Sequence, residues 1–153
     1  MNMYGYIKEQ PAILKQILER RKDITENFVK VFEKNDIKGI TIIGSGSSYN
    51  ASTSAKYFME KVLKIKVNVI YPYLFNNYEN ILNKDELFIA VSQGGRSSAT
   101  IDSVKKCKRL DLHNIVLTAE PKSPLRDLTN AVIDIACGEE LVGYKTKGYT
   151  STI

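Results

Sequence analysis

Along residues 39–136, short apolar runs rich in β-branched residues alternate with segments of helical periodicity. A strand, a helix and a second strand form a right-handed crossover, and successive crossovers build a parallel sheet with helices on both faces. We therefore expect an α/β protein, a three-layer α/β/α sandwich with a mostly parallel sheet. The expected strands are 39–43, 66–71, 87–91, 114–118 and 132–136, and the expected helices among them are 51–63, 100–110 and 123–128.

A helical arm is expected before this pattern. Apolar residues recur at helical spacing over residues 13–32, which predicts one long helix with Pro11 in its first turn. We expect the arm to occupy residues 1–35 and the α/β domain to occupy residues 36–153. The arm's apolar stripe is expected to pack on a second domain or subunit, with a homodimer as the assembly. Residues 150–153 resemble the start of a further helix, so we expect the chain to be the first half of a longer protein.

Composition narrows the class of protein. A length of 153 residues, 43% of them hydrophobic and 25% charged, is typical of one globular domain. No apolar run approaches the roughly 20 residues that cross a bilayer, and the first ten residues hold no secretory signal.

Cys107 and Cys137 lie in apolar-periodic segments, which predicts buried free thiols and a cytoplasmic location. The charge of +5 is spread over scattered lysines without an aromatic–basic motif, so we expect no nucleic acid partner and no membrane partner.

Two loops rich in serine and glycine follow two of the expected strands. The first is Gly44–Ser48 and the second is Ser92–Ser98. Ligands of parallel sheets bind beyond the carboxyl ends of the strands, where these loops lie. Glycines allow close approach, hydroxyls donate hydrogen bonds, and the following helix presents free N–H groups, a combination that suits a phosphate. Arg96 adds a charged donor. Serines that only cap helices are the alternative for either loop alone, and two such loops together favour binding.

Other familiar sites are not supported by the sequence. Tyr49 stands where a dinucleotide-binding G-x-G-x-x-G motif has its third glycine, and neither loop holds the Gly-Lys-Ser/Thr of a nucleotide triphosphatase. The sequence has a single histidine, His113, so it indicates neither a Ser-His-Asp triad nor a histidine-based metal site. We expect no cofactor and no metal.

Four stretches carry a resemblance to a known family: Glu9-Gln10-Pro11, Gly44–Tyr49, Val91–Thr100 and Gly138–Thr150. In this order they resemble the SIS (sugar isomerase) domain, most closely the first SIS domain in the isomerase half of glucosamine–fructose-6-phosphate synthase and its deglycase and deaminase relatives. The most specific piece is the third, VSQGGRSSAT, which is similar to the family's I-S-Q-S-G-E-T-x-D-T loop. The resemblance implies a flavodoxin-like SIS fold that binds a phosphosugar.

The resemblance also implies a set of residues that bind the sugar phosphate, with departures from the family pattern. Gly94 replaces a serine, Arg96 replaces an acid and Lys145 replaces a small residue, so a substrate other than fructose 6-phosphate is expected. Ser45 stands where many members have cysteine. The implied binding residues are Ser45, Gly46, Ser47, Ser48, Ser92, Gln93, Gly94, Ser97, Gly143 and Lys145.

The family's chemistry is aldose–ketose isomerisation, or making and breaking a C–N bond at a phosphosugar. Such chemistry needs a carboxylate base and a ring-opening acid. In two-domain members these groups lie largely in the second domain or a neighbouring subunit, so this chain alone is expected to be incomplete for catalysis. Glu140 is a weak candidate for the base. A non-catalytic domain that senses phosphosugars, or a pure dimerisation module, is the alternative.

Overall fold

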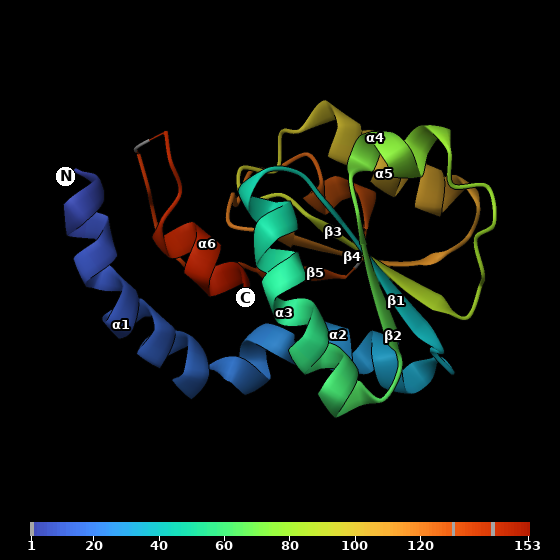
Figure 1. The fold of residues 1–153 in the computed structure, drawn as a ribbon, viewed down its shortest axis with the longest axis horizontal. Helices are drawn as coiled ribbons and strands as arrows, with labels where there is room; N and C mark the ends of the chain where they lie inside the picture. The colour runs from blue at the N-terminus through green and yellow to red at the C-terminus, as the bar shows by residue number, and fades with distance from the viewer. Residues whose placement is uncertain (1, 130, 142) are drawn as a thin grey trace.

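The computed structural model describes residues 2–129, 131–141 and 143–153. Helices and strands alternate along most of this length, and the helices flank a central sheet (Figure 1). The helices are α1 (Met3–Glu19), α2 (Arg21–Lys34), α3 (Ser47–Leu63), α4 (Pro72–Asn77), α5 (Ser98–Arg109) and α6 (Lys147–Thr152), with a short 3₁₀ helix, η1 (Arg126–Leu128). The strands are β1 (Gly39–Gly44), β2 (Lys66–Ile70), β3 (Glu86–Val91), β4 (His113–Thr118) and β5 (Val132–Asp134).

The five strands form one parallel sheet in the order β2-β1-β3-β4-β5. This is the flavodoxin-like order, in which the chain moves outward from β1 in one direction and then returns to continue in the other. The change of direction falls between β1 and β3. The α/β sandwich with a parallel sheet predicted from the sequence is therefore confirmed.

Both faces of the sheet are covered, because alternate residues of each strand point to opposite sides. On one face, Ile40 and Ile42 of β1 pack in a cluster with Phe28 of α2 and Met59 of α3. On the other face, Phe88 of β3 packs in a cluster with residues of α4 and α5, and neighbouring Ala90 joins a second cluster with α5 and η1. Strands β1 and β3 are apolar along most of their length for this reason.

The N-terminal arm differs from its prediction. It consists of two helices that break at Arg20, where ψ is 10°, and α1 begins at Met3 instead of at Pro11. The Asn2 side chain accepts a hydrogen bond from Gly5 N at 3.0 Å and so caps a helix that continues through Pro11. The break lets α1 pack against α6 while α2 packs on the sheet beside β5 (Figure 1).

Smaller differences lie elsewhere along the chain. Helix α4 was not expected; Pro72 begins it, in the first turn, where its missing N–H is tolerated. The segment predicted as a helix from 123 to 128 is a single 3₁₀ turn, and β5 ends two residues earlier than predicted. Within the described residues, no helix is both long enough and apolar enough to cross a membrane.

Candidate functional site

The two serine- and glycine-rich loops begin side by side at the carboxyl edge of the sheet. Gly44, the last residue of β1, pairs in register with Val91, the last residue of β3. These strands are the two that flank the change of direction in the strand order. Crevices at this position of an open parallel sheet are where ligands bind. The fold therefore places both predicted loops at its most favourable ligand position.

In the first loop the serine hydroxyls take no part in capping the helix. Gly46 is the N-cap of α3, with no side-chain hydrogen bond to the first turn. Ser45 and Ser47 are exposed and Ser48 is half-buried. Within the described part of the chain, the hydroxyls of these three serines make no side-chain hydrogen bond. Their donors, together with the N-terminus of a 17-residue helix, are free for an anionic group.

The second loop is braced by Thr118, the last residue of β4, and by Ser123, which follows that strand. Gly95 has φ +61°, and a Cβ at this position would overlap the side chain of Ser123. The Ser123 hydroxyl donates to the Gly95 carbonyl at 3.0 Å, and the buried Thr118 hydroxyl donates to the Gln93 carbonyl at 3.2 Å. The loop backbone is therefore preorganised, which lowers the entropic cost of ligand binding.

Two serines of the second loop have different tasks. Ser97 is the N-cap of α5: its oxygen accepts hydrogen bonds from Thr100 N at 3.4 Å and Thr100 Oγ1 at 3.0 Å. The helix-capping explanation thus applies to Ser97, although its hydroxyl hydrogen is still free to donate. Ser92 is half-buried, and among the described residues its hydroxyl makes no side-chain hydrogen bond. Ser92 therefore resembles the serines of the first loop.

Glu140 lies in the fourth resembling stretch, Gly138–Thr150, which is the third segment of the site after the two loops, and it receives hydrogen bonds on both carboxylate oxygens. Oε1 accepts from Thr146 N and Thr146 Oγ1, each at 2.6 Å, and Oε2 accepts from Gly148 N at 3.1 Å and Gln93 Nε2 at 3.4 Å. Burial by itself would raise the pKa of Glu140, but these hydrogen bonds outweigh it and the pKa is lowered. A carboxylate satisfied in this way is a weak proton acceptor. The geometry gives Glu140 a structural task, and its catalytic role stays a prediction.

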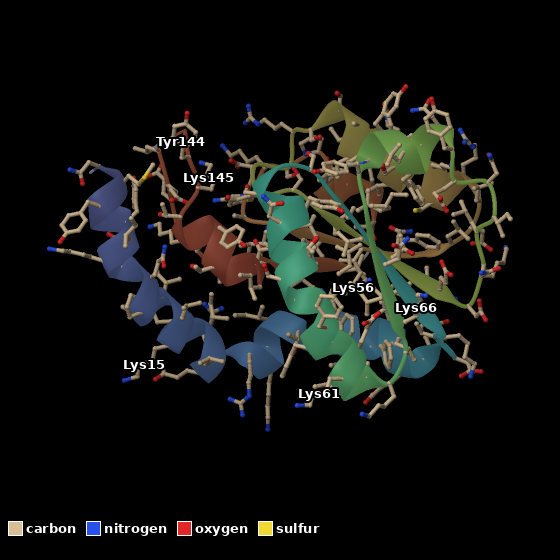
Figure 2. All side chains as sticks on the ribbon, in the orientation of Figure 1. Lys15, Lys56, Lys61, Lys66, Tyr144 and Lys145 are labelled. Atoms are coloured by element: carbon tan, nitrogen blue, oxygen red, sulfur yellow. The ribbon has the colours of Figure 1, made fainter. Side chains whose placement is uncertain are left out.

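A cavity of about 500 Å³ lies between the second loop and this third segment. Its lining includes Gln93, Gly94, Glu140 and Lys145. The Lys145 ammonium donates to the Glu140 carbonyl at 2.8 Å, and Figure 2 shows Lys145 and Tyr144 on the loop that leads into α6. Gly143 is exposed and is not among the residues that line this cavity. The four lining residues are thus brought together, beside the edge where the first loop lies.

Sequence reasoning missed four residues that support this region: Tyr6, Thr118, Ser123 and Lys147. Thr118 ends the fourth strand and Ser123 follows it, so their place at the carboxyl edge of a parallel sheet was the available signal. Lys147 lies within the fourth resembling stretch, Gly138–Thr150, but had no assigned task. Among residues 2–129, 131–141 and 143–153, no group of three or more His, Cys, Asp or Glu side chains could hold a metal ion.

Comparison with known proteins agrees with the sequence resemblance. The SIS domain family model matches residues 35–153. The glutamine–fructose-6-phosphate aminotransferase (isomerizing) of Helicobacter pylori is 29% identical over 151 residues, which cover 96% of this chain and 25% of that protein. The chain thus spans about a quarter of the length of the curated relatives it matches.

Two solved structures share the fold closely. The C-terminal domain of glucosamine-fructose-6-phosphate aminotransferase from Francisella tularensis is 28% identical with a TM-score of 0.83, covering 98% of this chain and 43% of that one. A proposed phosphosugar isomerase from Clostridium difficile is 25% identical with a TM-score of 0.89, covering 99% of this chain and 42% of that one. With the family match over residues 35–153, these likenesses confirm the resemblance predicted from four stretches of sequence, and the chain belongs to the SIS domain family.

Proposed function

We propose that this chain binds a phosphorylated sugar and holds its phosphate between the first loop, Gly44–Ser48, and the second loop, Ser92–Ser98. One observation carries the proposal. Three serine hydroxyls of the first loop and that of Ser92 have no hydrogen-bonding task within the described residues, and both loops begin at paired strand ends beside the change of direction in the sheet. Free hydroxyl donors beside a helix N-terminus suit a phosphate dianion.

The sugar is proposed to differ from fructose 6-phosphate. Gly94 offers only its backbone N–H where relatives of this kind are expected to have a serine hydroxyl. Arg96 is exposed and adds a forked cation at the same loop. Lys145 lines the neighbouring cavity, where its ammonium already has the Glu140 carbonyl as partner. A ligand with a second anionic group, reached by Arg96, fits this change in charge.

For the whole protein we propose an isomerase- or deglycase-type activity, with this chain as the phosphosugar-binding part and other groups completing catalysis. The division into a 1–35 arm and a 36–153 domain, a homodimeric assembly and a cytoplasmic location belong to the same proposal. The similarity to an isomerizing aminotransferase and to a proposed phosphosugar isomerase supports it. A phosphosugar sensor, the alternative class, would bind the same ligand without turnover, so turnover of a bound phosphosugar distinguishes the two.

Titration calorimetry with hexose 6-phosphates, the same hexoses without phosphate, and inorganic phosphate tests the binding claim. We expect the phosphorylated sugars to bind, and the unphosphorylated sugars to bind far more weakly. Ser47→Ala and Ser92→Ala should each weaken binding by about tenfold or more, because a hydrogen bond to a charged group contributes about 1.5–3 kcal/mol. Neither substitution removes a side-chain hydrogen bond of the described structure.

A matched control removes a hydroxyl of α3 that has no partner on α6. Ser54 is unsuitable, because Ser54 Oγ also lies 3.2 Å from the Tyr149 hydroxyl of α6, so the control is Thr53→Val. It removes an exposed hydroxyl from the same helix, α3, more than one turn beyond the loop, where Thr53 Oγ1 donates to the Tyr49 carbonyl at 2.9 Å. This variant should bind as the unmodified chain does. Equal affinity for phosphorylated and unphosphorylated hexoses, or no binding of either, would show that the loops do not form a phosphosugar site.

A further inference from the structure

The first helix reaches the third segment of the site through an ion pair whose lysine is buried. The Lys147 ammonium lies 2.8 Å from Glu9 Oε2; the Lys147 side chain is only 7% exposed, whereas that of Glu9 is 35% exposed. The same ammonium lies over the ring of Tyr6, 4.8 Å from its centroid. The Tyr6 hydroxyl in turn accepts a hydrogen bond from Leu141 N at 3.2 Å. Helix α1 therefore contacts both Leu141 and Lys147, which lie before and after Lys145 in the chain. Figure 1 shows α1 beside α6.

The residue after Lys147 touches the second loop directly. Gly148 N donates to Glu140 Oε2 at 3.1 Å, and Gln93 Nε2 donates to the same oxygen at 3.4 Å. A Cβ on Gly148 would overlap the Gln93 side-chain amide, so backbone and side chain are in close contact there. Any shift of Lys147 must move Gly148, and with it the partners that hold Gln93. A chain of contacts thus runs from Glu9 in the arm to the second loop.

The ion pair is the first contact in this series, beside the contacts of Tyr6 with Lys147 and Leu141. Glu9 is the side-chain acceptor that the described residues offer to the Lys147 ammonium. A buried charge that loses its partner is strongly unfavourable, whereas removing both charges of a buried pair is often tolerated. Without Glu9, Lys147 would be driven toward solvent and would pull the start of α6 away from Gln93.

We propose that Glu9 is a positioning residue of the phosphosugar site: through Lys147, docking of α1 holds Gln93 and the second loop in the geometry that binds phosphate. The inference rests on the proposed function. It makes the arm part of the binding machinery although Glu9 lies on a different element from either loop. Linkage requires the reverse effect as well, so a bound phosphosugar must tighten the docking of α1.

The decisive experiment compares Glu9→Gln with Glu19→Gln in the full chain. Glu19 is an exposed glutamate at the end of the same helix, so its substitution removes an equal charge without an ion pair. We expect Glu9→Gln to weaken binding of a hexose 6-phosphate about tenfold. This is the effect expected when α1 stays docked in about one molecule in ten, because only the docked molecules bind. Amide hydrogen exchange should rise at Gln93–Ser97. Glu19→Gln should change neither quantity.

Two further readouts separate positioning from a loss of stability. Glu9→Gln with Lys147→Met removes the unpaired charge and should restore most of the affinity. Hexose 6-phosphate should slow amide exchange in α1 of the unmodified chain and not in Glu9→Gln. If the unmodified chain binds no hexose 6-phosphate, the proposed function is wrong and this inference falls with it. If the unmodified chain binds and Glu9→Gln binds equally, with unchanged exchange at the second loop, only the positioning role is wrong.

Discussion

Substitution of Gly95 by alanine is expected to destabilise the protein more than any other single methyl group added to the second loop. Gly95 has φ +61°, and an added Cβ would overlap the Oγ and Cβ of Ser123 and crowd Thr118 Oγ1 at 2.9 Å. The left-handed conformation costs an alanine about 1–2 kcal/mol. Overpacking against buried neighbours costs about 1–3 kcal/mol more. The free energy of unfolding should therefore fall by about 2–5 kcal/mol.

Thermal and urea unfolding, followed by circular dichroism, measure this loss. For a domain of this size each kcal/mol corresponds to about 2–4 °C, so the midpoint temperature should fall by about 4–20 °C. Gly94→Ala is the control next to it in sequence, because a Cβ there meets nothing within 4 Å. Its unfolding free energy should change by less than about 0.5 kcal/mol. If Gly95→Ala unfolds at the same temperature as Gly94→Ala, Ser123 does not brace the loop as described.

Two other predictions concern ionisable groups. Glu140→Gln should make the free energy of unfolding depend less steeply on pH below 4.5. The pKa of Glu140 in the folded protein lies below its ordinary value of 4.5, so the ionised carboxylate stabilises the protein above that pH. This contribution is lost as the pH falls through the folded pKa. Equal slopes of unfolding free energy against pH for both chains, below pH 4.5, would contradict this. Burial raises the pKa of the Cys107 thiol to about 12, and burial followed by the charge of Glu140 raises that of Cys137. A thiol-reactive disulfide reagent should therefore modify neither cysteine at neutral pH until urea unfolds the chain, and rapid labelling of the folded protein would refute the burial of that thiol.

Much of the fold was predictable because its signals are local. A buried parallel strand is a short apolar run, and a covering helix repeats its apolar face every three or four residues, so both can be read within ten residues of sequence. Strands such as 87–91 and the positions of both loops follow from this. Helix α4 and the break at Arg20 were missed, because neither a single turn around Pro72 nor a change in the packing partner of a helix alters the periodicity.

Residue type and spacing dictate strands, helices and turns, so they were enough to predict an α/β chain with two serine- and glycine-rich loops at strand ends. Which hydroxyls remain free, and which groups hold the loops, depends on the tertiary packing. It gave Ser97 a capping task, surrounded Glu140 with four donors and paired Glu9 with Lys147, 138 residues away. Such contacts depend on how the crossovers bring distant segments together, and no local pattern encodes the distance between them.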